Sequence, residues 1–387
     1  MSVLVTSASG AKALVITRSL GRRDIEVTTT DCEQFSAAFF SKYSKSHFVC
    51  PSPTKSPLEF KNVIEKEVKK RKIEVLMPIN STETLLIAMH KNKLELYTKI
   101  PFADHPKMLQ LHNKDQLVKI ATELGLPTPK TCTVKDVREI RNIAEMIEYP
   151  AVLKLKDATS SMGIQYVNSK DEFIYNYKQS ILDYNLDPSC YPLIQEFIPG
   201  DGYGVSVLFN QGDLRALFTH KRLREYPITG GPSTFRESVR HPEMEEIAIK
   251  LLEYIDWHGV AMVEFKLDKR TNKPVLIEVN PRFWGSINQA ITAGVDFPYL
   301  LYKMATEGDI TPVLNYKLGV RTRFLMNDLR ALFSHLRHSN NRVQILKDFL
   351  NFDGIMSDDI ISCKDPLPMM FFAYTNMKEL LRRNQGA

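Results

Sequence analysis

The first third of the chain alternates between short apolar runs and segments with helical spacing. Apolar runs at 3–6, 25–30 and 75–78 have the length of buried strands. The stretch from the first run to about residue 20, and the stretch 84–90, have the spacing and capping residues of helices. Strands that alternate with helices predict a small parallel α/β sheet within residues 1–105.

The turn after the first predicted strand, residues 7–10 (Ser-Ala-Ser-Gly), lies where dinucleotide-binding proteins carry a glycine-rich loop. The spacing GxGxxG is absent, so a tight strand-to-helix turn is favoured over a dinucleotide site. The amino terminus of the following helix remains suited to a carboxylate or a phosphate, because its unpaired N–H groups carry partial positive charge.

A second region begins near residue 105. Residues 106–124 have helical spacing and end at Gly125, and Pro127 and Pro129 then predict an extended connector. A β-rich region follows to about residue 310, and predicted helices at 327–337, 343–350 and 376–383 dominate the remainder. The resulting division has four parts, at 1–105, 106–190, 191–310 and a C-terminal helical extension at 311–387.

Two strand-like segments, 260–267 and 274–282, flank a polar turn and predict a hairpin. Side chains alternate along a strand, so Glu278 and Asn280 point to the same face. If the hairpin is centred on its turn, Glu264 lies opposite Glu278. Two carboxylates that face each other in apolar strands repel, and a divalent cation relieves the repulsion. Oxygen ligands without His or Cys favour Mg²⁺.

Two points stay open for this hairpin. A solvated strand face with Lys266 as counter-ion explains a single glutamate, although it explains the set of three residues less well. The register is assumed, and a slip of one residue moves the carboxylates to opposite faces of the sheet.

A strand-like segment at 151–156 carries Lys154 and leads into a loop of small residues that includes Ser160, Ser161 and Gly163. A lysine beside hydroxyl groups and backbone amides suits a triphosphate, because the ammonium supplies charge while the loop covers the phosphates. An exposed edge strand with a hairpin turn explains the same residues equally well.

Two further segments suit a nucleotide. One strand-like segment ends at Glu196, Phe197 and Ile198, where backbone and side chains can contact a purine ring. A plain strand-to-turn transition is an equally good interpretation. The basic cluster with Lys221 and Arg222 precedes a glycine-rich turn, and it suits either the anionic oxygens of a phosphate or carboxylate, or a basic surface loop.

Composition mainly argues against certain classes of protein. Charged residues make up 25% of the 387 residues and the net charge is +6, but no long basic run with an aromatic platform predicts a nucleic-acid site. The five cysteines are scattered without CxxC spacing, which favours free thiols over disulfides or zinc. No apolar stretch has the length of a signal or membrane segment. We therefore expect a cytoplasmic protein without nucleic-acid or membrane partners.

In this order, the motifs resemble the ATP-grasp superfamily over roughly residues 1–310, most specifically in the run Glu-Val-Asn-Pro-Arg at 278–282. The resemblance implies an α/β pre-grasp domain at 1–105. It also implies an α+β ATP-grasp fold that holds ATP between two sub-domains, at 106–190 and 191–310. The role of the remaining residues is not implied.

The resemblance is closest to the uncharacterised carboxylate–amine ligases, a group similar to carbamoyl-phosphate synthase, through residues 221–225 and 230–234. It implies ATP and Mg²⁺, with Mn²⁺ as an alternative metal. The implied contacts are Lys114, Lys154, Ser160, Ser161 and Gly163 for the phosphates; Glu196, Phe197 and Ile198 for adenine; Asp201 for ribose; Glu264, Glu278 and Asn280 for the metal; and Arg282, Lys221 and Arg222 for the reacting groups.

The implied activity is an ATP-dependent ligase. A substrate carboxylate attacks the γ-phosphate to give an acyl phosphate, and an amine or a thiol then displaces phosphate. The implied partners are small-molecule acids and amines, with a homodimer as an option. The alternatives are a carboxylase-like enzyme that phosphorylates bicarbonate, suggested by Lys221, and an ATP-binding module without turnover.

Three positions depart from the family pattern. The phosphate loop has the single glycine Gly163, and Asp201 lies slightly out of place for a ribose-binding acid. Met262 stands where some ligases carry an arginine, two residues before the first metal carboxylate. The substrate is therefore less well determined by the resemblance than the nucleotide.

Overall fold

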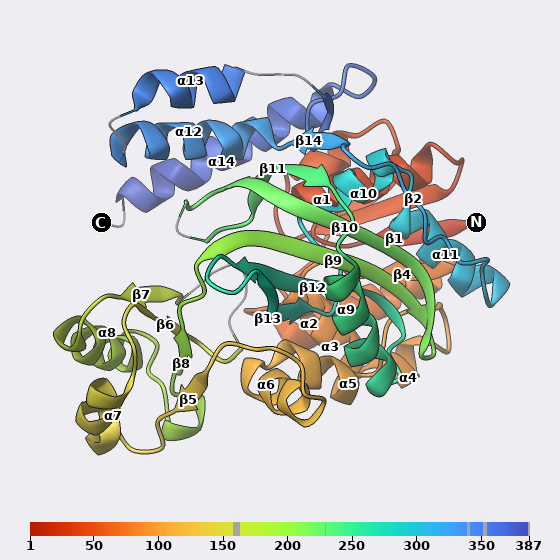
Figure 1. Cartoon of the computed structure of the whole chain (residues 1–387). Helices are drawn as coiled ribbons and strands as arrows, with labels where there is room; N and C mark the ends of the chain where they lie inside the picture. Colours follow the sequence, from red (N-terminus) through yellow and green to blue (C-terminus); the bar gives the residue numbers. More distant parts are fainter. Residues whose placement is uncertain (158–162, 229, 339–340, 351–353, 386–387) are drawn as a thin grey trace.

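The N-terminal part of the chain is a four-stranded parallel sheet of order β3-β2-β1-β4, as the sequence predicted (Figure 1). The protein is described from a computed structural model that covers residues 1–157, 163–228, 230–338, 341–350 and 354–385. The strands are β1 Ser2–Val5, β2 Glu26–Asp31, β3 Ser44–Val49 and β4 Val75–Met77. The helices are α1 Ala11–Gly21, η1 Ala37–Phe40, α2 Pro57–Arg71, α3 Ser81–Met89 and α4 Lys91–Leu94.

The turn between β1 and α1 is closed by protein groups. Ser7 has a left-handed φ of 56°, and the N–H of Gly10 donates to the carbonyl of Ser7 at 3.0 Å. The N–H of Ser9 donates to a carboxylate oxygen of Asp31 at 2.7 Å. Asp31, the last residue of β2, thus lies against this turn. This agrees with the prediction that residues 7–10 form a tight packing turn and not a dinucleotide-binding loop.

The prediction of one helix over 106–124 is wrong. The chain forms α5 His105–His112 and α6 Lys114–Glu123, and Asn113 between them is extended, with ψ of 117°. The side chain of Asn113 accepts a hydrogen bond from the N–H of Gln116 at 3.0 Å. Asparagine bonds more favourably at a helix N-cap than inside a helix, so the continuous pattern breaks there. Lys114 consequently begins α6.

Residues 131–196 form a separate lobe with a four-stranded sheet of order β5-β8-β6-β7. Its elements are β5 Thr131–Thr133, η2 Val137–Glu139, α7 Ile140–Met146, β6 Ala151–Lys154, β7 Gln165–Val167, α8 Lys170–Asp183, η3 Pro188–Cys190 and β8 Leu193–Glu196. Because β8 pairs with both β5 and β6, the predicted boundary at residue 190 falls inside this sheet. The lobe has its own apolar core, which includes Leu153, Phe173 and Tyr177.

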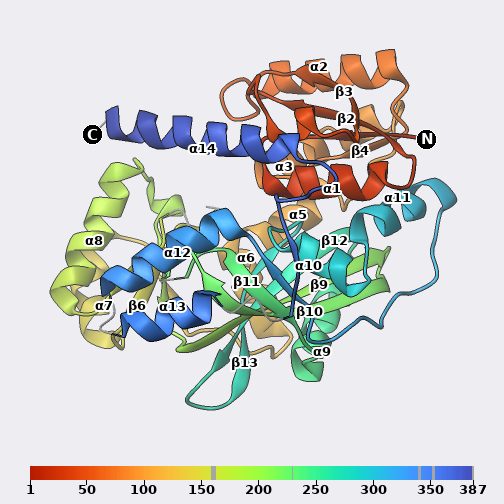
Figure 2. The same cartoon turned by 90° about the horizontal axis from the view of Figure 1, so that it is seen from above.

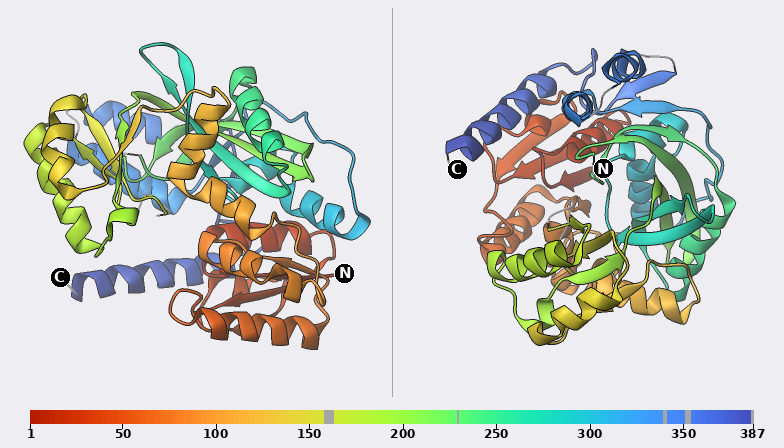
Figure 3. Two further views of the ribbon diagram at one scale, coloured as in Figure 1. Left: turned by 90° about the horizontal axis from the view of Figure 1, so that it is seen from below. Right: turned by 60° about the vertical axis from the view of Figure 1, so that its left-hand side comes forward.

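A seven-stranded sheet of order β13-β12-β9-β10-β11-β14-β15 forms the body. Its elements before residue 311 are β9 Gly200–Asn210, β10 Asp213–Glu225, β11 Ser233–Ser238, α9 Pro242–Tyr254, β12 Gly259–Asp268, β13 Lys273–Asn280, α10 Ile287–Ala293 and α11 Phe297–Glu307. One apolar core joins this sheet to the N-terminal sheet and includes Val5, Met77, Phe265 and Trp284. The two sheets therefore form one packed unit, and the small lobe lies to one side of it (Figure 3).

The C-terminal part adds strands as well as helices. Its elements are β14 Arg321–Arg323, α12 Leu325–His338, α13 Arg342–Leu350, β15 Ile355–Asp358 and α14 Leu367–Gln385. The three helices cover the predicted ones, whereas the two strands extend the large sheet and were not predicted. Helix α14 starts beside the N-terminal sheet and projects beyond it (Figure 2).

Two buried ion pairs fasten the segment between β15 and α14 to both parts of the packed unit. Asp359 accepts from Arg236 of β11, and these side chains are 1% and 0% exposed. Asp365 accepts from Nε of Arg18 in α1 at 2.8 Å. The C-terminal segment thus connects the N-terminal sheet to the large sheet through charges that solvent does not reach.

We predict that Asp359→Ala lowers the free energy of unfolding by about 3–5 kcal/mol, because Arg236 is left buried without its counter-ion. Urea titration followed by circular dichroism measures the change. The matched control is Asp213→Ala, since Asp213 pairs with Arg215 at the surface, with its side chain 73% exposed. The control is expected to cost less than about 1 kcal/mol. Equal losses in the two variants would contradict the assignment.

Candidate active site

The β12–β13 hairpin has the predicted register. Glu264 pairs directly with Glu278, and Met262 pairs with Asn280. A register irregularity follows Glu264, between this residue and Phe265. Such irregularities change where a strand directs its side chains and are frequent beside active sites. The two carboxylates are therefore neighbours on adjacent strands, as the sequence predicted.

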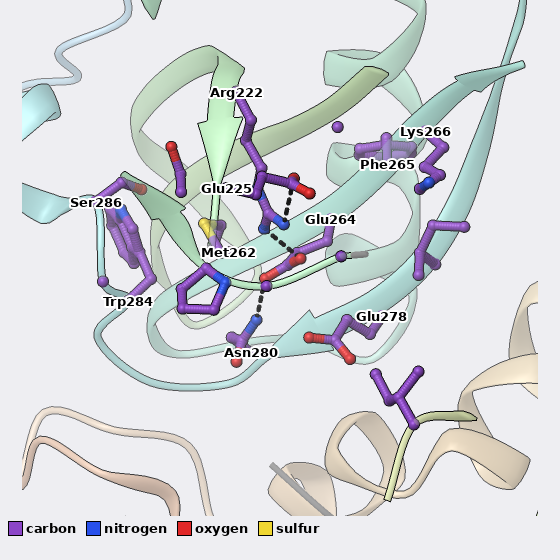
Figure 4. Close-up of a pocket in the computed structure, with 18 of the residues that line it drawn as sticks. Arg222, Glu225, Met262, Glu264, Phe265, Lys266, Glu278, Asn280, Trp284 and Ser286 are labelled. Carbon is purple, nitrogen blue, oxygen red and sulfur yellow. Dashed lines mark hydrogen bonds and ion pairs between the residues drawn. The ribbon is translucent and has the colours of Figure 1, made fainter. Parts of the chain in front are cut away.

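Glu264 is held by two nitrogen donors (Figure 4). One carboxylate oxygen accepts from Arg222 of β10, and the other accepts from Nδ2 of Asn280 at 2.8 Å. Arg222 reaches Glu264 across β9, where Gly202 leaves room: a Cβ on Gly202 would lie 3.0 Å from Cδ of Arg222. Burial raises the pKa of Glu264 above its ordinary value, and the Arg222 guanidinium opposes that rise.

Arg282 connects this hairpin to the N-terminal domain. Its guanidinium donates to Oδ1 of Asn280 at 2.7 Å, to Oγ of Ser81 at 2.6 Å and to the carbonyl of Phe283 at 2.7 Å. Ser81 is the first residue of α3, so the N-terminal domain forms part of the site. All three guanidinium nitrogens of Arg282 thus donate to protein oxygens near the carboxylate pair.

The carboxylate pair fits a hard divalent cation. Glu278 makes no hydrogen bond or ion pair with any other described side chain, although it faces Glu264. Oδ1 of Asn280 keeps a second lone pair beside the one that Arg282 uses. Among the described residues no three His, Cys, Asp or Glu side chains gather at one point. Nucleotide phosphates and water would supply the remaining ligands, as is usual for Mg²⁺.

The pair lies in a cavity of about 340 Å³ between the small lobe and the large sheet. At one end Phe197 makes an edge-to-face contact with Tyr166, with ring centroids 5.8 Å apart, and Nζ of Lys266 lies 5.5 Å from the Phe197 centroid. The other apolar residues at this end are Val152, Ile164, Ile198, Phe265 and Ile277. This slot of aromatic and aliphatic groups suits a flat purine.

Lys154 lines the same cavity from β6. Burial lowers its pKa to about 8, and Glu278 partly opposes that shift. Within the described ranges its ammonium has no hydrogen-bond partner, so it can bind an anion that enters beside Glu278.

Other predicted phosphate and ribose residues lie outside the cavity lining. Lys114 is buried at the start of α6, where its N–H donates to the carbonyl of Lys156 at 3.2 Å. Lys221 and Asp201 form an ion pair with each other at 2.7 Å. Their predicted roles are therefore not supported by the lining of this cavity.

The predicted phosphate loop is described only at its end. Ser160 and Ser161 lie outside the described residues. Gly163 has a left-handed φ of 67°, and a Cβ there would meet Cδ1 of Leu155 at 2.5 Å, so glycine is required. Glu196 lines the same cavity, and its carboxylate accepts a hydrogen bond from Arg270 at 2.7 Å.

Sequence reasoning missed several lining residues. Lys12 comes from α1, and Phe324 and Asn327 come from the C-terminal part. The position of Lys12 directly after the turn 7–10, at a helix terminus suited to an anion, was the available signal. Phe324 and Asn327 carry no local pattern that links them to a site, because only the tertiary fold brings them there.

Comparison with known proteins identifies the class. Residues 111–286 match the family model of the ATP-grasp domain. The chain is 26% identical over 264 residues to the D-aspartate ligase of Enterococcus faecium, an alignment that spans 62% of each protein. The chain thus spans about three fifths of the length of that relative.

Two solved structures share the fold. The biotin carboxylase domain of Hydrogenobacter thermophilus 2-oxoglutarate carboxylase has a TM-score of 0.69 at 16% identity, over 82% of this chain and 73% of that one. The L-amino acid ligase of Bacillus licheniformis has a TM-score of 0.62 at 16% identity, over 80% and 77%. Residues 111–286 therefore correspond to an ATP-grasp domain, and the chain places a parallel α/β domain before it.

In the described part of the chain, no helix combines the length and the apolar character needed to cross a bilayer.

We predict that nucleotide affinity falls as the pH rises through about 8, because Lys154 is charged below its pKa of about 8 and neutral above it. Bound phosphates favour the charged form, so the loss approaches about tenfold per pH unit. Calorimetric titration of a non-hydrolysable ATP analogue with excess Mg²⁺ measures this. In Lys154→Arg, which stays charged, the affinity is expected to be independent of pH in this range. The same pH dependence in that variant would contradict the role of Lys154.

Proposed function

We propose that this protein is an ATP- and Mg²⁺-dependent ligase that joins a small carboxylic acid to an amine through an acyl phosphate and releases ADP and phosphate. The observation that carries the proposal is the carboxylate pair Glu264 and Glu278, with Arg282 bound to the adjoining Asn280, inside a cavity that also has an apolar slot. The similarity to D-aspartate ligase supports a carboxylic acid and an amine as the two classes of substrate.

The chain's own residues mainly position the reactants and neutralise charge. Phe197 and Ile198 hold the purine, and Lys154 binds the phosphates. Mg²⁺, or Mn²⁺ in its place, would be held by Glu264, Glu278 and Asn280 and would offset the phosphate charge. In this proposal Arg282 stabilises the oxygens of the transferred phosphoryl group and of the acyl phosphate.

The bonds made and broken balance when the γ-phosphoryl group is transferred to a substrate carboxylate. The substrate carboxylate forms a bond to the γ-phosphorus while the bond to the ADP oxygen breaks, and no protein nucleophile takes part. An amine then bonds to the acyl carbon, the bond from that carbon to the phosphate oxygen breaks, and phosphate leaves with the electron pair of that bond. The attacking nitrogen loses a proton, so the products are an amide and phosphate. Arg222 binds Glu264 and Glu225, and its positive charge opposes the rise in the pKa of Glu264 that burial causes.

No described contact favours the bicarbonate alternative. Lys221 suggested the bicarbonate alternative, but its ammonium binds Asp201 at 2.7 Å, and neither residue lines the cavity. A module without turnover would not need the unpartnered carboxylate of Glu278 beside that of Glu264. For partners, we propose small-molecule acids and amines in the cytoplasm. A homodimer is consistent with the dimeric biotin carboxylase domain that shares the fold.

The test is ADP release by purified protein with ATP, Mg²⁺ and a panel of paired acids and amines. Hydroxylamine in place of the amine should trap the acyl phosphate as a hydroxamate. Glu278→Gln is expected to lower ADP release by about 100-fold or more, because the metal and phosphoryl charges lose one of their two carboxylates.

The matched control is Glu237→Gln, a glutamate of β11 that pairs with Arg321 at 3.4 Å and lies outside the cavity lining. This variant should retain the activity of the unmodified protein. ATP binding without acid-dependent ADP release from any pair would overturn the ligase and favour the module. Release that depends on bicarbonate alone would favour the carboxylase.

A further inference from the structure

The cavity continues past the carboxylate pair to an end that the nucleotide does not need. Figure 4 shows Met262, Trp284 and Ser286 on one side of Glu264 and Lys266 on the other. Lys266 belongs to the purine slot, where it lies over Phe197. The opposite end, called here the distal end, is therefore open to a second reactant beside the phosphates.

Three parts of the chain build the distal end. Lys12 comes from α1, Trp284 and Ser286 follow β13, and Phe324 and Asn327 belong to the C-terminal part at the start of α12. The buried ion pairs of Asp359 and Asp365 hold that C-terminal part against both sheets. The C-terminal part thus supplies a wall of the cavity.

The distal end carries one basic side chain, Lys12, that is not paired with an anion of the described residues. Lys12 has no hydrogen bond or ion pair with any described residue. Its pKa lies well below the ordinary value, chiefly because of burial and secondly because of the Arg282 guanidinium, while Glu83 acts in the opposite sense. The positive charges of Lys12 and Arg282 repel each other, and a carboxylate bound between them would relieve that repulsion.

No carboxylate of the cavity pairs with Lys12. Of the four that line it, Glu196 binds Arg270, Glu225 and Glu264 bind Arg222, and Glu278 faces Glu264. The charge on Lys12 is therefore available to a ligand.

The remaining wall of the distal end is mainly apolar. Met262 and Trp284 are 4% and 0% exposed, and Phe324 makes an edge contact with Phe372 at 5.7 Å between centroids. Among the residues that line this end, Lys12 and Arg282 carry the positive charges, and Arg282 already donates to protein oxygens. A second carboxylate on the substrate would thus lack a counter-charge, and its burial would be costly.

We propose that the acid substrate has one carboxylate on an apolar or aromatic body. Lys12 holds that carboxylate beside Arg282, and Met262, Trp284 and Phe324 contact the body. This proposal rests on the proposed ligase function and narrows its acid to a chemical class. Lys12 is a substrate-binding residue in this scheme, because it touches the acid and takes no part in the proton or phosphoryl transfer.

The first experiment measures acid binding without turnover. 3-Phenylpropionate and hexanoate are compared with succinate and aspartate by calorimetry, in the presence of Mg²⁺ and a non-hydrolysable ATP analogue. The apolar acids are expected to bind at least about tenfold more tightly, because a second buried carboxylate lacks a partner. The same acids are then compared in ADP release as kcat/KM.

The second experiment tests Lys12. Lys12→Met is expected to weaken binding of 3-phenylpropionate by about 10- to 100-fold, as the loss of a hydrogen bond to a charged group implies, with nucleotide affinity within about twofold. Lys12→Arg should restore part of the loss. Lys45→Met, at an exposed lysine of the same domain, should leave acid binding unchanged. Met262→Gln should reduce the preference for apolar acids.

The outcomes separate this proposal from the ligase function. Apolar acids that bind through Lys12 without supporting ADP release would support Lys12 as the binding site of an apolar acid and overturn the ligase function. ADP release with succinate or aspartate only, unchanged by Lys12→Met, would overturn this proposal and leave the ligase intact. Neither binding nor ADP release with any acid would overturn both.

Discussion

The repulsion between Glu264 and Glu278 is the constraint to which the rest of the site responds. Two carboxylates on directly paired residues of adjacent strands destabilise a sheet unless positive charge lies close to them. Arg222 supplies that charge, and the glycine at 202 of β9 leaves room for its side chain to reach Glu264. The hairpin, the neighbouring strands and the basic residue of β10 thus form one electrostatic unit.

The same unit reaches beyond its sheet. Arg282 bonds both to Asn280 of the hairpin and to Ser81 of α3, so the N-terminal domain is held at the carboxylates by a buried guanidinium. A continuous apolar core joins these two parts, whereas the lobe with Lys154 has a core of its own. Lys154 therefore lies on a body that packs separately from the carboxylates, and the cavity is lined by both bodies.

The sequence predicted the elements whose signals are local and periodic. The register of Glu264 with Glu278 followed from strand alternation and a short polar turn, and the structure confirms it. The break at Asn113 was missed because the apolar spacing continues through it, while the side-chain cap that breaks the helix has only a weak pattern. Lys221 bonds to Asp201 because neighbouring strands bring the two together, a pairing that neither residue's local sequence indicates.

The chemistry of Asn280 shows why an amide, and not a third carboxylate, completes this set. Arg282 can only donate hydrogen bonds, so the oxygen of Asn280 must face it, and Nδ2 is then directed to Glu264. An aspartate at 280 would place a third negative charge against Glu264 and remove the donor that Glu264 now uses. The neutral amide instead links an anion to a cation and keeps one oxygen lone pair that Arg282 does not use. The chain of hydrogen bonds from Arg282 through Asn280 to Glu264 therefore has only one possible direction, because Arg282 can only donate and the Glu264 carboxylate accepts. Glu278 is then the carboxylate of the pair that has no hydrogen-bond partner among the described residues.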